Sequence, residues 1–168
     1  MNGLNQVKAA LVERLRGAGI RAVGGYGDKK AAAYPDAVAV VEVAKATGTA
    51  MGLGNYLGTA QVGGVVRELY GQKMDVSISV DIYAPGGAEA CEAAMERAAE
   101  ALMSGLPSGL RLGEISWGET RWDKAEQRYV RRGTLCCTAC FTATVEQETG
   151  ILLDFILKGV MRSAQHGT

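Results

Sequence analysis

Two cysteines in CxxC spacing, Cys137 and Cys140, are the first residues whose types could do chemistry. Such pairs act in redox reactions when a helix N-terminus activates a thiolate, and they hold zinc when a second ligand pair is present. Here the surrounding sequence alternates like a strand, in which residues three apart point to opposite faces. The single histidine, His166, lies close to the C-terminus. We therefore expect cysteines that fill a strand, with no metal site and no redox pair.

Other catalytic patterns are also incomplete. Asp75 and Asp81 share one strand face but lie about 20 Å apart by strand rise, too far for an acid–base pair. Residues 52–58, GLGNYLG, resemble a dinucleotide-binding fingerprint only loosely, because the third glycine is one position late. The following TAQVGG cannot open the helix that would meet a pyrophosphate. The prediction is a protein that is not an enzyme and holds no cofactor.

A basic and aromatic cluster is the remaining candidate site. It includes Arg121, Trp122, Arg128 and Arg131, with acidic residues interleaved. A solvated hairpin tip is our first interpretation. A protein interface is the second, since arginine, tryptophan and tyrosine are frequent interface anchors, and nucleic acid is the third. Eighteen basic residues balance eighteen acidic ones, and phosphate binding needs a basic surplus, so no specific nucleic-acid partner is expected.

The bulk composition indicates one globular domain. The chain has 168 residues, 48% of them hydrophobic, which is enough for a sizeable core. No apolar run approaches the roughly 20 residues that span a bilayer, so no membrane association is expected. The amphipathic N-terminus has no apolar signal-peptide core, and we expect synthesis in a reducing cytoplasm. We assign residues 1–150 to one domain and residues 151–168 to a C-terminal strand or arm.

Two long alternating segments form the predicted centre of the fold. Residues 74–83 alternate apolar and polar side chains without interruption, the pattern of a half-buried strand. Residues 128–145 form the second strand, with one face led by leucine, alanine and phenylalanine and the other by threonine and cysteine. Strand segments at 110–117 and 119–122 precede it across a polar turn at 123–127, which predicts an antiparallel hairpin.

Helical periodicity marks two segments, residues 4–15 and 88–103. Residues 37–46 form a further strand, buried on both sides in its first half, after a loop at 24–34. We also expect a short strand at 65–70 and a turn at Gly71-Gln72. The predicted fold class is α+β, a mostly antiparallel sheet with two main helices packed on one face.

Residues 47–64 look like a long, mobile, glycine-rich loop, with six glycines among eighteen residues and neither helical nor strand period. Five of its residues are too apolar for a simple solvated linker: Met51, Leu53, Tyr56, Leu57 and Val62. The segment either folds over the domain's own core or orders against a neighbouring subunit, and the sequence favours neither.

The C-terminal segment, residues 151–168, carries an apolar run that includes Phe155 and Leu157. Its periodicity does not separate helix from strand, and we favour strand because Gly159 would weaken a helix. An apolar segment after a finished domain is a candidate for pairing with another subunit, although docking on the home sheet is the simpler expectation.

The order of these elements resembles that of the tail terminator, or tail completion, proteins of long-tailed bacteriophages and related contractile phage-tail-like particles. The resemblance spans residues 4–161: a helix, a strand, the glycine-rich segment, then MDVSISVDIYAP, the helix AEACEAAMERAAEALMSGL and the hairpin ending in TLCCTACFTATV. The resemblance rests on the order of the elements and on their general residue composition, and no residue motif is transferred with it.

The resemblance implies a structural subunit that forms a ring, usually a hexamer, which caps the tail tube and prepares it for head joining. Its partners would be further copies of itself, the tube, and sheath or head-connector proteins, assembled in the bacterial cytoplasm and retained in the particle. Another tail part (tube, baseplate or connector) is the first alternative, and a small-ligand-binding domain is the second. The candidate interface residues are Met51, Leu53, Tyr56, Leu57, Arg121, Trp122, Arg128, Arg131, Phe155 and Leu157.

Overall fold

The computed structural model describes residues 3–27, 29–145 and 152–157. The helices are α1 (Gly3–Gly17) and α2 (Ala88–Met103), with short 3-10 turns at Ala31–Ala33 and Leu53–Asn55. The strands are β1 (Arg21–Val23), β2 (Val38–Ala50), β3 (Tyr56–Val62), β4 (Val65–Ala84), β5 (Leu110–Asp123), β6 (Arg128–Val145) and β7 (Leu152–Leu157).

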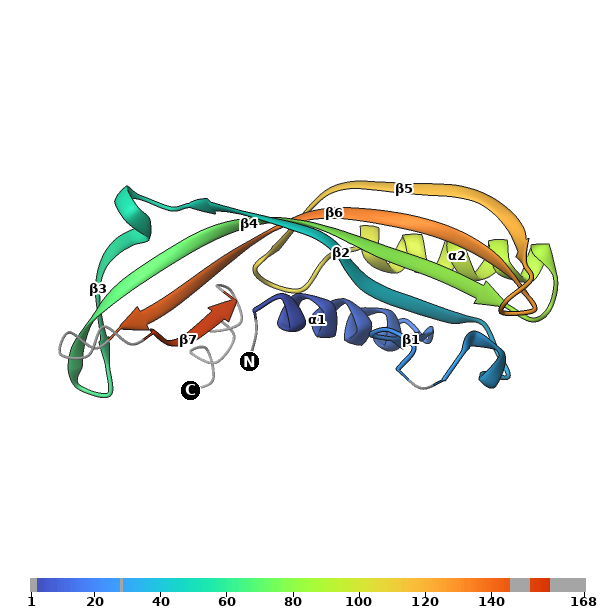
Figure 1. Cartoon of the computed structure of the whole chain (residues 1–168), viewed down its shortest axis with the longest axis horizontal. Coiled ribbons are helices and arrows are strands. Elements are labelled where there is room, and N and C mark those ends of the chain that lie inside the picture. Colours follow the sequence, from blue (N-terminus) through green and yellow to red (C-terminus); the bar gives the residue numbers. More distant parts are fainter. Residues whose placement is uncertain (1–2, 28, 146–151, 158–168) are drawn as a thin grey trace.

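All seven strands belong to one sheet, whose centre is the antiparallel pair β4 and β6 (Figure 1). On one side of β4, β2 and β3 pair with successive stretches of that strand. On the far side of β6, β5 and β7 do the same. Only β1 is parallel, against the start of β2. The two long strands thus set the length of the molecule, and the shorter strands flank them end to end.

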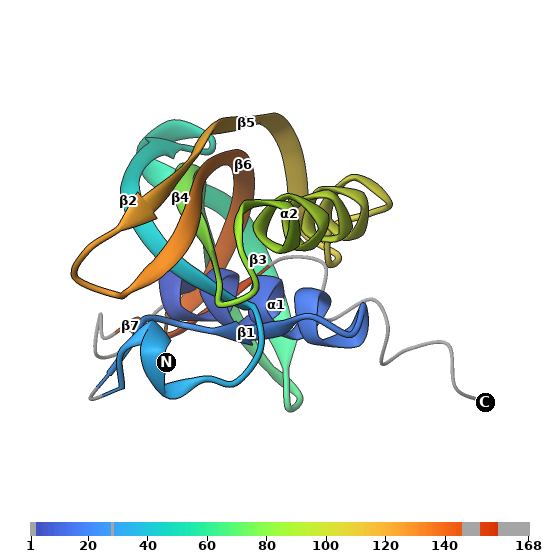
Figure 2. The ribbon, with the colours of Figure 1, turned by 90° about the vertical axis from the view of Figure 1, so that its right-hand side faces the viewer.

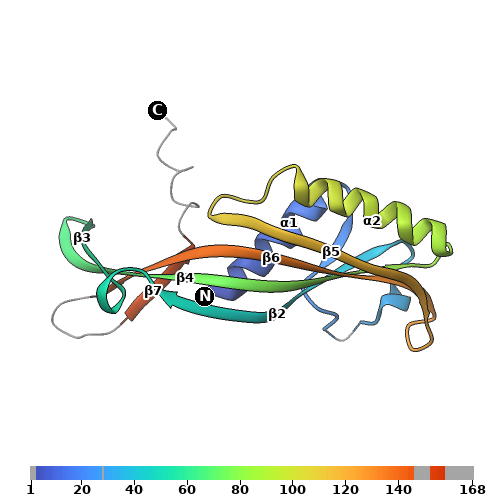
Figure 3. The same cartoon turned by 90° about the horizontal axis from the view of Figure 1, so that it is seen from above.

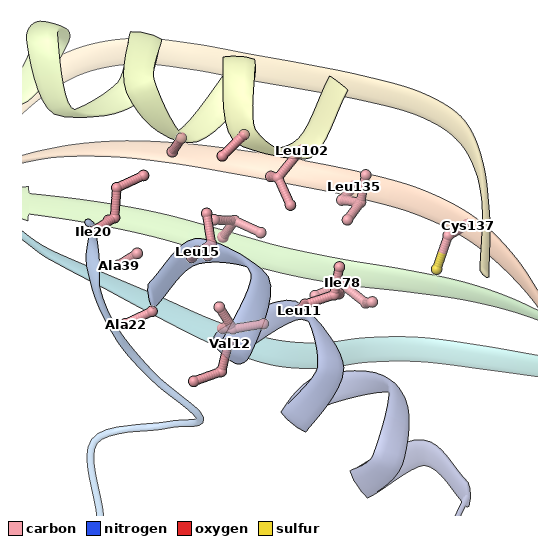
Figure 4. Close-up of a cluster of buried hydrophobic side chains, with 14 of the residues drawn as sticks. Leu11, Val12, Leu15, Ile20, Ala22, Ala39, Ile78, Leu102, Leu135 and Cys137 are labelled. Atoms are coloured by element: carbon pink, nitrogen blue, oxygen red, sulfur yellow. The ribbon is translucent and has the colours of Figure 1, made fainter. Parts of the chain in front are cut away.

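Both helices pack on one face of the sheet (Figure 2). Alternation explains this, since the even-numbered residues of β4 from Val76 to Ala84 and the odd-numbered residues of β6 from Leu135 to Phe141 point to that face. Leu11 and Leu15 of α1 and Leu102 of α2 meet Ile78 of β4 and Leu135 of β6, all of them buried (Figure 4). The expected α+β fold, with two helices on one face of a mostly antiparallel sheet, is confirmed.

A smaller apolar cluster lies on the opposite face of the sheet, at one end. It joins Val38 and Val40 to Tyr83 and Val130. Ala39 and Val41, the alternate residues of β2, belong to the main core. The first half of β2 is therefore buried on both sides, as its β-branched run predicts.

The helices, the hairpin of β5 and β6 and its polar turn lie where the sequence predicts them. The expected strands at 110–117 and 119–122 are one strand, β5, interrupted by a register shift between Trp117 and Thr120. The three-residue strand β1 was not predicted, because it lies between a helix end and a loop and is too short for any period to be visible.

The expected loop at 47–64 is wrong. Residues 47–50 continue β2 in register with β4, residues 56–62 form β3, and only 51–55 connect them. The helices do not extend over this part of the sheet (Figure 3), so neither face needs an apolar row and the alternation is lost. Small and glycine residues form strands here because β4 satisfies their backbone groups.

The expected turn at Gly71-Gln72 is also wrong, because β4 runs through it without a break. Glycine serves a packing role at this position. The Leu57 side chain lies against Gly71 so closely that a β-carbon would collide with it. Gly71 therefore marks a close approach between strands and not the end of one.

The C-terminal segment forms a strand at 152–157, as favoured, and it pairs with β6 of its own sheet. The remaining predicted arm residues, 151 and 158–168, lie outside the described part of the chain.

Candidate functional site

Among the described residues, five of the eight exposed large hydrophobic side chains lie on the distal arm, which we define as residues 51–70: the 3-10 turn, β3 and the facing end of β4. Leu53 is 95% exposed, and Val65 and Val66 are 55% and 58% exposed. The arm extends beyond the two helices at one end of the molecule (Figure 3). Soluble domains expose single apolar residues routinely, but here Val62, Val65 and Val66 gather at the hairpin turn and Leu53 and Tyr56 lie at the other end of β3, which indicates a contact surface along the arm.

The distal arm is held in shape by its own contacts. The rings of Tyr56 and Tyr70 meet edge to face, with centroids 5.6 Å apart. The hairpin turns at Gly63-Gly64, both with positive φ (61° and 82°), which glycine adopts without strain. Met51 is half-buried, and its N–H donates to the Gly71 carbonyl oxygen at 3.3 Å. This surface is therefore preorganised.

The predicted basic and aromatic cluster lies at the opposite end of the sheet, on the hairpin tip, which we define as residues 120–131 (Figure 1). Trp122 is 48% exposed and packs edge-on against Tyr129, with ring centroids 5.2 Å apart. Arg121 is exposed. Arg131 is half-buried and lies 3.8 Å from a Glu92 carboxylate oxygen, so it ties the tip to α2.

Arg128 corrects the sequence analysis, because it is buried and cannot serve as an exposed interface residue. Its side chain is 7% exposed. The guanidinium donates to the carbonyl oxygens of Tyr34 at 2.6 Å, Ala32 at 3.2 Å and Asp36 at 3.4 Å. Nearby, the Glu126 carboxylate accepts a hydrogen bond from the Ala31 N–H at 2.7 Å. The hairpin tip is thus fastened to the loop before β2.

The structure separates the predicted interface residues into two groups. Met51, Leu53, Tyr56 and Leu57 belong to the distal arm, and Arg121, Trp122 and Arg131 to the hairpin tip. Phe155 and Leu157 occupy β7, at register positions opposite Ala143 and Phe141 of β6. Val65 and Val66 also belong to the first group, because the Gly63-Gly64 turn brings Val65 opposite Val62. Sequence reasoning missed these two residues, although two glycines between apolar residues are a recognised hairpin signal.

A cleft of about 690 Å³ lies between the end of α1, β1 and the middle of α2. Three arginines line it, Arg16, Arg21 and Arg97. Two of them have partners in the chain: Arg16 donates to the Ala22 carbonyl oxygen at 2.9 Å, and Arg21 pairs with Asp36 at 3.4 Å. Residues 51–58, on which the ligand-binding alternative rested, take no part in this cleft.

The groups that could do chemistry are dispersed. Cys136 is exposed on one face of β6 and Cys137 is buried on the other, where burial raises the pKa of its thiol to about 11. Asp75 accepts a hydrogen bond from the Thr138 hydroxyl at 2.8 Å. Burial raises the pKa of Asp81, although nearby Arg132 opposes this. Within the described ranges, no three histidine, cysteine or acidic residues cluster in a way that could hold a metal.

Neither helix in the described part of the chain is long and apolar enough to cross a bilayer. The chain matches no protein-family model and no curated protein. Function therefore has to be argued from the geometry of the sheet and its two ends.

Proposed function

We propose that this chain is a structural subunit of a phage-type tail, which assembles into a ring that terminates the tail tube and prepares it for head joining. The proposal starts from the element order that resembles tail terminator proteins. The observation that carries it is the asymmetry of the sheet: helices cover one part, and the other part projects as a preorganised arm with an exposed apolar tip.

A ring of identical subunits uses heterologous contacts, which need two different surfaces on each subunit. The distal arm and the hairpin tip are two different exposed surfaces at opposite ends of one sheet, which suits a subunit that contacts neighbouring copies as well as the tube and a head connector. The arm presents aliphatic side chains and the tip presents Trp122 and Arg121, residue types that often anchor interfaces. A single-subunit enzyme has no need of either surface.

Electron microscopy of the purified protein, alone and with tail tubes, tests the proposal. We expect closed rings, and we expect tails of abnormal length from a strain that lacks the protein. A protein that stays monomeric at all concentrations, together with tails of normal length, would overturn the proposal. If this protein is seen along the whole tube, or at the end of the tail far from the head, the alternatives of a tube or a baseplate subunit would be favoured.

A matched pair of substitutions tests the role of the arm. Val66→Ser removes an aliphatic side chain that is 58% exposed on the arm, and Met103→Ser removes one that is 70% exposed at the end of α2. Both should leave the fold intact, because neither side chain is in the core. We expect only Val66→Ser to weaken ring formation. Equal effects of the two substitutions would exclude a specific role for the arm.

A further inference from the structure

We infer that two copies of this chain join by pairing the open edge of β2, residues 46–49, with the open edge of β5, residues 114–117, in an antiparallel continuation of the sheet. The inference rests on the proposed function and deepens it, because it names the strand edges that join neighbouring ring subunits side by side; the distal arm and the hairpin tip lie outside this joint. Backbone N–H and C=O groups are strong hydrogen-bonding groups, and those on an open strand edge have no partner strand.

The edge of β2 is open and unprotected beyond its first residues. In the described part of the chain, β1 covers only Val38–Val40, and no strand pairs with the outer edge after that. Residues 46–50, Ala-Thr-Gly-Thr-Ala, are regular in register and mostly exposed. They contain no charge, proline or bulge, the devices that usually keep sheet edges from pairing.

The direction of the backbone groups follows from one hydrogen bond. The Met51 N–H donates to the Gly71 carbonyl oxygen, so Met51 faces β4. Every second residue before it does the same, which places Thr47 and Thr49 toward β4. Ala46 and Gly48 therefore direct their N–H and C=O groups outward, to the open edge.

The opposite edge of the sheet is β5, which pairs only with β6 in the described residues. Bulges interrupt it between Leu112 and Glu114 and between Trp117 and Thr120. Residues 114–117 form the regular stretch between them. In β4 the odd-numbered residues direct their backbone groups to β2, so the even-numbered ones face β6, where odd-numbered residues lie opposite them. The even-numbered residues of β6 therefore face β5, and Glu114 and Ser116 lie opposite these. Ile115 and Trp117 therefore direct their backbone groups outward.

Strand polarity decides how these edges can meet. From one edge to the other, β2, β4, β6 and β5 alternate in direction. Because an even number of strands alternates, rotating a copy about an axis along the strands places β5 antiparallel to the next β2. An odd number would have produced a parallel joint. The fold can thus be repeated around a ring with the pairing it already uses.

Side chains on the two edges complement each other in size. With Thr47 opposite Ser116, Gly48 faces Ile115 and Ala46 faces Trp117. All four lie on the helix-covered side of the sheet, where small residues of one copy meet large, half-buried residues of the next. On the other side Thr47 meets Ser116, and Thr49 lies opposite Glu114, an exposed residue at the end of the paired stretch.

Disulfide trapping tests the joint. Thr47→Cys with Ser116→Cys, in a chain carrying Cys136→Ser and Cys140→Ser, places two thiols in a non-hydrogen-bonded antiparallel pair, about 4.5 Å apart at Cα and within bridging range. Within one copy these residues are three strand spacings apart, about 14 Å, and cannot bridge. We expect a ladder of cross-linked oligomers that ends at one closed size.

Two controls sharpen the result. Thr49→Cys with Ser116→Cys shifts the pair to a diagonal about 7–8 Å apart, and we expect severalfold less cross-linking. Ser116→Cys alone should give none. An equal yield from the shifted pair, or dimers from Ser116→Cys alone, would overturn the inference, because the latter outcome means that β5 pairs with β5.

Hydrogen exchange gives a readout without mutation. On association, the exchange rates of the outward-facing Gly48 and Ile115 amides should fall at least tenfold. The exchange rate of the Thr49 amide, which is already bonded to β4, should not change. Rings that form without either signal would overturn the joint and leave the proposed function standing. If oligomers are trapped but a strain that lacks the protein makes tails of normal length, the joint would stand and the proposed function would be overturned.

Discussion

The Arg128 guanidinium donates a hydrogen bond of 2.6 Å to the carbonyl oxygen of Tyr34, a residue 94 positions earlier in the chain. The contact joins the hairpin tip to the loop that leads into β2. A buried arginine is costly unless its donors are satisfied, and three carbonyl oxygens satisfy this one. The planar fork of arginine suits such a set, whereas a lysine ammonium would not span it.

We expect Arg128→Met to lower the free energy of unfolding by about 2–4 kcal/mol, because it removes several charge-assisted hydrogen bonds and leaves three carbonyl groups without this donor. Arg128→Lys should recover only part of the loss. Denaturant unfolding measures both. The matched control is Arg121→Met, at an exposed position of the same hairpin, which should stay within about 0.5 kcal/mol of the native protein. Equal effects at the two arginines would refute a specific stabilising role for the Arg128 hydrogen bonds.

Gly133→Ala should destabilise the protein by about 1–3 kcal/mol through overpacking. The Trp117 indole lies against Gly133 on the neighbouring strand, and a β-carbon there would collide with the ring. Replacing Trp117 by leucine in the Gly133→Ala protein should restore part of the stability, as thermal unfolding can show. Gly118→Ala is the control, since a β-carbon there is 3.5 Å from its nearest atom. Additive effects of Gly133→Ala and Trp117→Leu would argue against the contact.

Asp81→Asn should raise the free energy of unfolding at pH 7. Burial raises the pKa of Asp81 above its ordinary value in the folded state, despite the opposing charge of Arg132. The folded protein then holds this proton more tightly than the unfolded chain, so the ionised carboxylate reduces stability as the pH rises through the raised pKa. The benefit of the amide should vanish below about pH 4, where the carboxyl is protonated in both states. A loss of stability at pH 7 would mean that the Arg132 contact outweighs burial.

Thiol reagents should modify Cys136 well before its neighbour Cys137 in the folded protein at pH 8. Cys136 is exposed, whereas Cys137 is buried and its thiol pKa is raised to about 11, which leaves very little thiolate. Cys91, buried in α2 with its thiol donating to the Ile82 carbonyl oxygen, should also be protected. Mass spectrometry of labelled peptides measures this order. Denaturant should abolish the difference, and similar native rates would contradict the assigned strand faces.

The sequence was informative wherever one face of an element is covered and the other is not. Residues 76–82 and 135–143 alternate because helices cover one side only, so the bounds of β6 and the end of β4 were predicted to within one residue, whereas the start of β4 at Val65 was not. The same logic failed at Thr59 and Ala60. No helix covers the sheet there, and composition no longer reports which way a side chain points.

The interface residues show a second limit. Arg121 and Arg128 are the same residue type in one hairpin, yet one is exposed and the other is fully engaged. The difference depends on the loop at 31–36, which docks from a distant part of the sequence. The residues around Arg121 and Arg128 therefore do not indicate which of the two arginines is buried. The open edge at residues 46–50 was hidden for the opposite reason, because small uncharged residues also suit a loop.

The central pair of strands also determines how the molecule bears load. β4 and β6 stay in register without interruption from Glu68 and Val145 to Ala84 and Tyr129. Tension between the distal arm on β4 and the hairpin tip on β6 acts along these strands and stresses their hydrogen bonds in shear, all at once. A force across the sheet would unzip them one after another. The subunit is therefore mechanically strongest along its long axis, the direction that joins its two exposed ends.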